Sequence, residues 1–312
     1  MGPAVRSGRG DAVPRLACLA RHDRRPGARH RPGLNVDAPR SLLFLPASNP
    51  RAVEKARGLG CDLAVLDLED AVAPEMKAEA RAAAVMAVKA GGFRGAVGVR
   101  VNALGTDWGE TDLEALAGLP LDWIIVPKVE EPGLIDAYDA RMDEGVRLCA
   151  MIETPRALLT LAHIAAAGGP LKALMLGVND LAATLGTGPS QDREPLKPWL
   201  AATVAAARAN GLAAIDGVFN GLSDLEGLAA ECAQGRLYGF DGKSLIHPNQ
   251  IEAANAAFAP SPDEIAQAQA IVDAFAAPGA EGSGAIRVAD AMVERLHLAR
   301  AQALLARAAA SR

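Results

Sequence analysis

Two acidic residues that follow neighbouring apolar runs are the clearest chemical signal in this chain. Glu153 follows the run 146–152, and Asp180 follows the run 173–178. Each run has the length and composition of a buried parallel strand, and the ends of such strands meet at one edge of a sheet. Two carboxylates that close together repel each other unless a cation neutralises them. Because few oxygen ligands with room for water and substrate suit Mg²⁺, we expect Glu153 and Asp180 to hold magnesium.

An alternative is that both acids only cap the helices that follow them, where the helix dipole favours negative charge. Polar residues end most of the other apolar runs as well, which favours a functional edge over isolated caps. These further rim residues are Asp67, Glu69, Asp70, Arg100, Asn102, Lys128, Asp216 and Lys243.

The chemistry that these residue types favour is a metal-assisted reaction on a carboxylate or carbonyl substrate. A metal ion would polarise a substrate oxygen, and Arg100 offers a bidentate fork for an oxyanion or a carboxylate. Asn102 and helix-start N–H groups could complete an anion pocket. The chain has no Gly-x-Ser-x-Gly sequence, which argues against a serine acyl-enzyme. A Schiff base on Lys128 or Lys243 is disfavoured, because nearby carboxylates keep a lysine protonated.

Strand and helix patterns alternate along most of the chain and predict a (β/α)₈ TIM barrel over residues 37–259. A doubly wound open sheet is the competing fold, but it would need a glycine-rich turn after the first strand, and 46–50 contains no glycine. The eight predicted strands are 41–46, 63–67, 96–101, 123–127, 146–152, 173–178, 213–216 and 238–243.

The pattern changes after the barrel, where residues 260–312 predict a C-terminal helical extension. A helix over 264–276 is followed by a glycine-rich linker at 278–284 and by a last helix over 288–309. We expect this extension to act as a lid or to reach a neighbouring subunit.

The first 36 residues are rich in arginine, proline and glycine, and we expect a disordered basic arm there. Their eight arginines and two aspartates give a net charge of +6, so the rest of a chain with net charge −5 carries −11. The negative charge of residues 37–312 argues against nucleic-acid binding. No apolar stretch is long enough to predict a membrane span. The four cysteines are scattered and form no zinc pattern, which is typical of a cytoplasmic protein.

Several separated motifs together resemble the citrate lyase beta subunit family, within the wider HpcH/HpaI aldolase group. The resemblance covers residues 40–307 and depends on the order and spacing of the motifs rather than on any one of them. The motifs are RSLLFLP at 40–46, LDLEDAV at 66–72, VRVN at 99–102, PKVE at 127–130, IET at 152–154, Asp180-Leu181, AIDGV at 214–218 and GFDGKSLIHPNQ at 239–250.

The resemblance implies a (β/α)₈ barrel that assembles as a homotrimer or hexamer and binds Mg²⁺ at Glu153 and Asp180. It implies cleavage, or the reverse Claisen condensation, of a 3-hydroxyacyl-CoA thioester such as malyl-CoA, citramalyl-CoA or citryl-CoA. It places Arg100 at the substrate and Arg40 near the substrate or the CoA tail. Glu69 and Asp70 would lie in the outer shell of the metal, and we also expect Lys128 and Asn102 to contact the substrate.

The chain departs from the family pattern at two positions. Asn179 stands where relatives usually carry a glutamate before Asp-Leu, which removes one charge beside Asp180. Glu294 stands where related malyl-CoA lyases carry an aspartate that acts as a base across a subunit interface. Glu294 could be the catalytic base here, or it could pair with Arg295 or Arg300 on an exposed helix face.

Three other functions remain open from the sequence. One is a metal-dependent aldolase that acts on free 2-oxo acids, although the chain has no histidine between His30 and His163. Another is the subunit of a larger complex that cleaves a citryl-acyl-carrier protein. The last is a non-catalytic binding barrel, which the combination of Glu153, Asp180 and Arg100 argues against.

Overall fold

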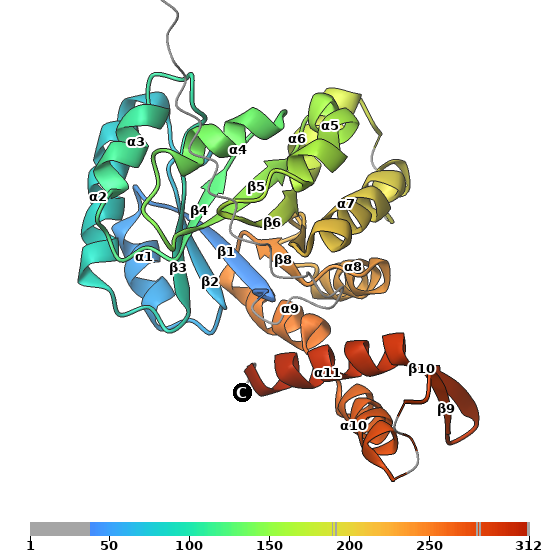
Figure 1. Cartoon of the computed structure of the whole chain (residues 1–312). Helices are drawn as coiled ribbons and strands as arrows, with labels where there is room; N and C mark the ends of the chain where they lie inside the picture. Colours follow the sequence, from blue (N-terminus) through green and yellow to red (C-terminus); the bar gives the residue numbers. More distant parts are fainter. Residues whose placement is uncertain (1–37, 189, 191, 279, 281, 311–312) are drawn as a thin grey trace, which may run out of the picture. The chain divides into compact units, whose positions relative to one another are not determined.

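The structure, a computed structural model, describes residues 38–188, 190, 192–278, 280 and 282–310. Eight parallel strands form a closed barrel in which each strand pairs with the next and β8 pairs with β1 (Figure 1). The (β/α)₈ prediction is therefore confirmed, and the open doubly wound sheet is excluded. The strands are β1 Ser41–Pro46, β2 Leu63–Asp67, β3 Ala96–Arg100, β4 Trp123–Val126, β5 Arg147–Ile152, β6 Leu171–Leu176, β7 Ala213–Asp216 and β8 Gly242–Leu245.

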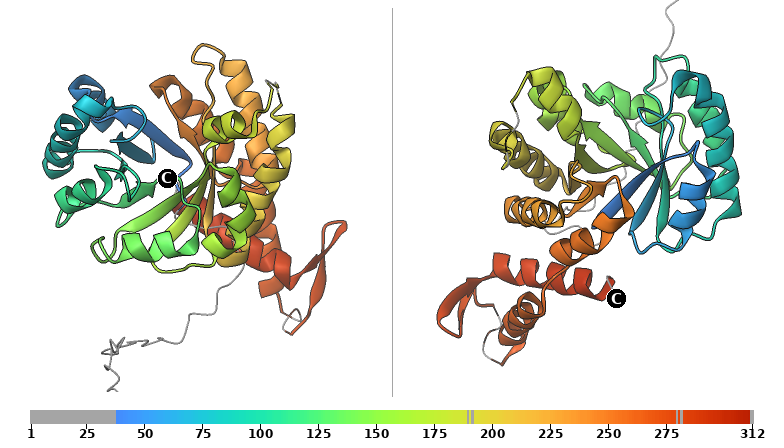
Figure 2. Two further views of the ribbon diagram at one scale, coloured as in Figure 1. Left: turned by 90° about the horizontal axis from the view of Figure 1, so that it is seen from above. Right: turned by 180° about the vertical axis from the view of Figure 1, so that it is seen from behind.

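Helices cover the outside of the strands, as the views from above and behind also show (Figures 1 and 2). Several begin with proline, which is favoured at a first helical position because its missing N–H has no partner there. The helices around the barrel are α1 Pro50–Arg57, α2 Lys77–Ala90, α3 Gly109–Leu116, α4 Pro132–Asp139, α5 Pro155–Ala165, α6 Val178–Leu185, α7 Lys197–Asn210, α8 Leu225–Tyr238 and α9 Ile251–Phe258.

The predicted position of the eighth strand is wrong, because strand β8 begins at Gly242 rather than at residue 238. Helix α8 continues to Tyr238 and ends at Gly239, whose φ of 98° lies in the left-handed region that glycine adopts readily. A Cβ at Gly242 would lie 2.0 Å from the carbonyl oxygen of Pro39, so β8 can pass this segment only with a glycine there. The tyrosine and phenylalanine before Gly242 suggested a strand but belong to the helix end and its turn.

The barrel interior is filled by alternate residues of each strand. On β5 the inward residues are Cys149 and Met151, and on β6 they are Ala173 and Met175. The register pairs Met151 with Met175 and Ile152 with Leu176. Continuing this alternation by one step places Glu153 at the rim of the barrel, facing the interior.

The C-terminal region contains a β-hairpin that the sequence did not predict. Residues 288–294 were expected to be helical, but strands β9 Ala285–Val288 and β10 Ala291–Glu294 pair antiparallel before helix α11 Arg295–Ala310. Helix α10 Pro262–Ala276 precedes the hairpin and matches its prediction closely. The two-residue turn between the strands includes Ala289 with a φ of 52°, as tight hairpin turns require.

Helix α11 is tied to the barrel through a buried ion pair. The Nη1 group of Arg307 donates to the carboxylate of Asp241 at 2.9 Å, and its Nη2 group donates to the carbonyl oxygen of Asp241. Asp241 lies directly before β8 and also accepts from Arg208 at 2.7 Å. The predicted arm at residues 1–36 lies outside the described residues. Among the helices that the structure describes, none is long and apolar enough to cross a membrane.

Candidate active site

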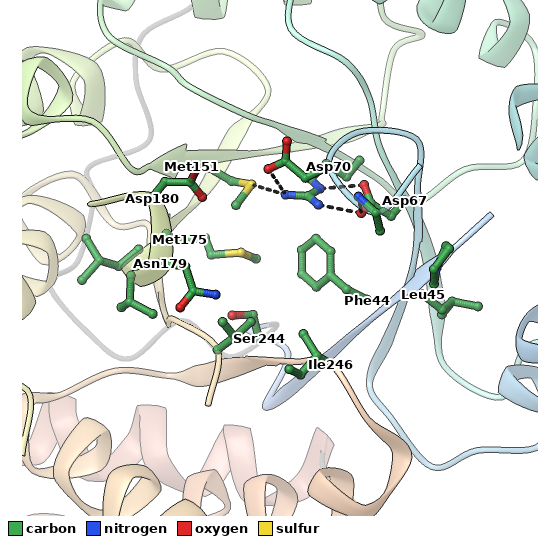
Figure 3. A pocket seen from close by; sticks show the side chains of 17 residues that line it. Phe44, Leu45, Asp67, Asp70, Met151, Met175, Asn179, Asp180, Ser244 and Ile246 are labelled. Atoms are coloured by element: carbon green, nitrogen blue, oxygen red, sulfur yellow. Dashed lines mark hydrogen bonds and ion pairs between the residues drawn. The ribbon is translucent and has the colours of Figure 1, made fainter. Parts of the chain in front are cut away.

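A cavity of about 420 Å³ opens at the carboxyl ends of the strands, and the predicted rim residues Asp67, Asp70, Arg100 and Asp180 line it. Its apolar wall comes from Phe44, Met151, Met175, Val178, Val218 and Ile246. In Figure 3, Asp180, Asp70 and Asp67 lie along the upper part of the view, Ser244 and Ile246 lie along the lower part, and Phe44 and Met175 lie between them. The cavity therefore combines an acidic edge with an apolar wall, which is typical of a small-molecule site.

Glu153 is the most unusual residue of the site, because it is an acid with only 1% of its surface exposed. Its Oε1 atom accepts from the backbone N–H of Lys128 at 2.7 Å, whereas its Oε2 atom is buried without a hydrogen-bond partner. Burial, with the nearby charges of Glu69 and Asp180, raises the pKa of Glu153 to about 7. An unpartnered buried carboxylate oxygen is costly, so a cation beside it would remove the cost.

Gly177 makes the space that Glu153 occupies. It directly follows β6 and faces Glu153 across the β5–β6 pair, where its N–H bonds the carbonyl of Ile152 at 2.9 Å. A Cβ at this position would lie 2.4 Å from the Cβ and 2.6 Å from the Oε2 of Glu153. Only a glycine lets the two strand ends approach this closely.

Asp180 lies in the first turn of α6, a helix that the sequence did not predict, and it lines the cavity. This position is compatible with the alternative that Asp180 favours a helix start. The same alternative does not hold for Glu153, because Thr154 caps α5 by accepting from the N–H of Ala157 at 3.2 Å.

The donor set fits a hard divalent cation with an incomplete protein shell. Within the described ranges, no group of three or more His, Cys, Asp or Glu side chains is arranged to hold a metal. Glu153 and Asp180 would thus be two ligands of an ion that keeps water or substrate at its other positions, as Mg²⁺ usually does. The free Oε2 atom of Glu153 supports this fit.

Arg100 is held in place by the register of the barrel. Asp67 on β2 is its direct partner on β3, and the two side chains form a bidentate pair with distances of 2.7 and 2.6 Å. Its Nη1 group also lies 2.9 Å from Glu69. Burial alone would lower the pKa of Arg100, but these carboxylates hold it above the usual value, so the guanidinium stays charged. The ring of Phe44 lies 5.2 Å from the guanidinium carbon.

Glu69 bridges two cations beside the cavity. One oxygen of its carboxylate contacts Arg100, and the other accepts from the Nζ group of Lys128 at 2.6 Å. Burial raises the pKa of Glu69, although both cations oppose that shift. Asp70 is more exposed and lies 3.7 Å from Lys128 and 3.9 Å from Arg100. Glu69, Asp70 and Lys128 are thus brought together with Arg100, as the sequence predicted.

Asn102 is buried near Glu69, but its amide group is already hydrogen-bonded to other protein groups. Its amide nitrogen donates to the carbonyl of Leu68 and to Asp112, and its amide oxygen accepts from Lys77. Lys77 also donates to the carbonyls of Leu68 and Glu69 at 2.7 Å each. Asn102 therefore fixes the loop that carries Glu69, and it does not line the cavity.

Two predicted site residues lie away from this cavity. Arg40 precedes β1, at the amino end of the strands, where its guanidinium forms a bidentate pair with Asp62 at 2.8 Å. The family resemblance implied a place near the substrate or the CoA tail for Arg40, but β1 runs from Ser41 to Pro46 between Arg40 and the rim. Glu294 is exposed at the end of β10, rather than on a helix, and is not among the residues that line the cavity.

Several residues of the site were not identified from the sequence. Phe44, Met151, Met175 and Gly177 all line the cavity. The alternation along β5 and β6 contains the signal, because Met151 and Met175 lie two residues before Glu153 and Gly177 respectively. The pairing of Asp67 with Arg100 could not be found in this way, since the register between strands is not visible in the sequence.

Comparison with known proteins identifies the family. Residues 40–248 match the family model described as HpcH/HpaI aldolase/citrate lyase. The chain belongs to this family. Its family membership makes it an enzyme of the carbon–carbon lyase type and confirms the resemblance found in the sequence.

Relatives within the family refine the comparison. The chain is 44% identical over 273 residues to a (3S)-malyl-CoA thioesterase of Cereibacter sphaeroides, covering 87% of this chain and 95% of that protein. It is 33% identical over 299 residues to an L-malyl-CoA/beta-methylmalyl-CoA lyase of the same organism, covering 86% and 94%. The structure of CitE from Mycobacterium tuberculosis in complex with magnesium, acetoacetate and coenzyme A is 32% identical, with a TM-score of 0.70 and coverage of 86% and 97%. These family relatives support activity on CoA thioesters.

Proposed function

We propose that this chain is a Mg²⁺-dependent lyase that cleaves or forms a 3-hydroxyacyl-CoA thioester of the malyl-CoA class. The observation that carries the proposal is the unpartnered buried Oε2 atom of Glu153, at a rim that also holds Asp180 and Arg100. The magnesium and coenzyme A bound to the structurally similar CitE support the same ligands here. Magnesium, when bound, would act as a Lewis acid that polarises a substrate oxygen.

Arg100 is suited to stabilise negative charge on the thioester oxygen. When the bond between C2 and C3 breaks, its electron pair moves to the thioester carbonyl as an enolate, and C2 then takes a proton. Asp67 and Glu69 fix the guanidinium, and the Nη1 group also lies 4.0 Å from the sulfur of Met151, a weak acceptor. A second N–H of Nη1 is therefore available to a substrate oxygen. A preorganised donor of this kind contributes about 3 kcal/mol to transition-state stabilisation.

The apolar wall suits the remainder of the substrate. Phe44, Met175 and Ile246 offer contact surface for the acyl chain and the start of the carrier arm. Ile246 is 40% exposed at this edge, so a bound substrate could cover it.

A base must remove the proton of the 3-hydroxyl group, and we propose Glu294 for this role. It lies outside the cavity of its own chain, on a hairpin whose Met292 is 77% exposed. We therefore propose that the hairpin of one subunit completes the site of another within a homotrimer or hexamer. The exposure of Met292 supports a partner for this hairpin.

Thioester hydrolysis is the second candidate, and the relative named (3S)-malyl-CoA thioesterase favours it. In that reaction water adds to the thioester carbonyl and the CoA thiolate leaves, so the carbon chain stays intact. Arg100 and the metal held by Glu153 and Asp180 could act in this reaction too, because negative charge again develops on the thioester oxygen.

Product analysis separates these reactions. The purified protein would be incubated with malyl-CoA, with and without Mg²⁺, and the products separated by chromatography. The lyase proposal predicts Mg²⁺-dependent acetyl-CoA and glyoxylate in equal amounts. Malate with free CoA would establish hydrolysis instead. Turnover of free 2-oxo acids alone, with no thioester consumed, would contradict both.

A further inference from the structure

Lys128 has a backbone conformation that a residue with a side chain rarely adopts. It follows β4 with a φ of 52°, in the left-handed region. Among the residues that the structure describes, the other non-glycine residues with positive φ are Arg193 and Ala289. This region is disfavoured because Cβ approaches the backbone oxygen too closely. Strained backbone of this kind persists where the surroundings hold it, often at functional sites.

In this conformation the backbone N–H and the Nζ group of Lys128 contact different acids. Its backbone N–H donates to Oε1 of Glu153 at 2.7 Å, and its Nζ group contacts Glu69 at 2.6 Å and Asp70 at 3.7 Å. The amide thus orients the Glu153 carboxylate, whose other oxygen remains unpartnered. The ammonium group holds Glu69 in its contact with Arg100.

We propose that Lys128 is a positioning residue that fixes Glu153 with its amide and restrains Glu69 with its ammonium group, rather than a ligand of the substrate. The inference concerns the magnesium site and rests on the proposed function to that extent. Glu69 is one of the acids at this rim that are not assigned to the metal, and the ammonium group of Lys128 compensates its charge. The ammonium group keeps Glu69 in contact with Arg100, and Glu69 in turn orients the guanidinium.

This assignment predicts opposite effects of Lys128→Gln on metal binding and on turnover. Removing a positive charge next to the acids should make Mg²⁺ bind about fivefold more tightly. Releasing Glu69 from its restraint should lower kcat/KM by about tenfold or more, since Arg100 loses its fixed orientation. A residue with a merely structural role would weaken both, whereas loss of a direct contact to the substrate would appear mainly as a raised KM with kcat little changed.

The test is calorimetric titration of Mg²⁺ into the whole chain, without substrate, at pH 8.5. Wild type, Lys128→Gln and Lys128→Arg would be compared, with Glu153→Gln as a control that loses the site. We expect Lys128→Arg to match wild type because it keeps the charge. Equal or weaker Mg²⁺ binding in Lys128→Gln than in wild type overturns the proposal. Because no substrate is present, this result stands even if no thioester proves to be turned over.

The backbone part of the inference has its own test in the metal-free protein. Lys128→Gly relieves the left-handed strain, whereas Lys128→Ala keeps it, and both lose the ammonium group. We expect the glycine variant to melt about 2 °C higher than the alanine variant, with the same Mg²⁺ affinity. An alanine variant as stable as the glycine variant would show that the backbone is not strained at this position.

Discussion

A single buried carboxylate explains much of the chemistry of this site. Glu153 is held by one amide on one oxygen and by nothing on the other, in a space that Gly177 keeps open. Such an arrangement is unfavourable for the protein alone, because the charged form lacks solvent and partners. It becomes favourable when a cation binds, so the feature that lowers the stability of the metal-free protein is the same one that binds the metal.

The raised pKa of Glu153 predicts a specific dependence of stability on pH. The folded pKa of about 7 lies above the ordinary value of a glutamate, so the folded protein binds more protons than the unfolded chain between these two values. Its stability therefore falls as the pH rises through this window. In EDTA, we expect Glu153→Gln to be more stable than wild type at pH 8, by up to about 3 kcal/mol, with no difference at pH 4. Denaturant melts at both pH values provide the measurement, and the same difference at both would contradict the burial argument.

The close contact at Gly177 predicts that adding one methyl group disrupts the metal site. In Gly177→Ala, the new Cβ would meet the Cβ and Oε2 of Glu153 at 2.4 and 2.6 Å. We expect Mg²⁺ affinity to fall by more than about tenfold and stability to fall by about 1–3 kcal/mol. Gly133→Ala is the matched control, because a Cβ there has nothing within 4 Å. Unchanged Mg²⁺ binding in Gly177→Ala would show that Glu153 can move away without loss.

At the level of elements, the sequence predicted strands better than helices. Seven strands were located because parallel strands buried on both faces are continuous apolar runs, as in Leu63–Asp67. The eighth was misplaced because aromatic residues at a helix end look like a strand. Helix α6 was missed because Val178–Leu185 is short and follows a strand without a polar break. The hairpin was read as a helix because its strands have only four residues each.

The anchoring of α11 depends on Arg307, which is buried against Asp241. Removing one partner of a buried ion pair leaves the other charge uncompensated. We expect Arg307→Ala to cost about 3 kcal/mol of stability and to increase hydrogen exchange in α10 and α11. Arg300→Ala is the control, because this residue is exposed on the same helix. If both variants behaved alike, the ion pair would not be what holds the helix.

For the molecule as a whole, the sequence predicted the acidic pair, Arg100 and its neighbours because they end successive strands of one barrel. It could not predict that Arg40 lies at the opposite end of β1, or that Asn102 is used internally, since both depend on contacts between distant segments. The proposed role of Glu294 depends on assembly with a second chain, because Glu294 lies on an exposed hairpin and does not line the cavity of its own chain.

If Glu294 works in the site of a neighbouring subunit, two inactive variants should complement each other. We expect Glu153→Gln and Glu294→Ala each to lower kcat by about a hundredfold or more. Mixed oligomers, refolded together, would contain some sites with both wild-type residues and should recover part of the activity. Activity of the unmixed Glu294→Ala variant near the wild-type level would remove Glu294 from the mechanism.

We propose that Glu153 and Asp180 hold one divalent ion beside Arg100. Anomalous diffraction from crystals soaked in Mn²⁺, with Glu153→Gln crystals measured in parallel, tests it most directly. We expect one strong peak at about 2.1 Å from Oε2 of Glu153 and from the carboxylate of Asp180, absent in the variant. A peak elsewhere, or none at this pair in a soaked wild-type crystal, would contradict it.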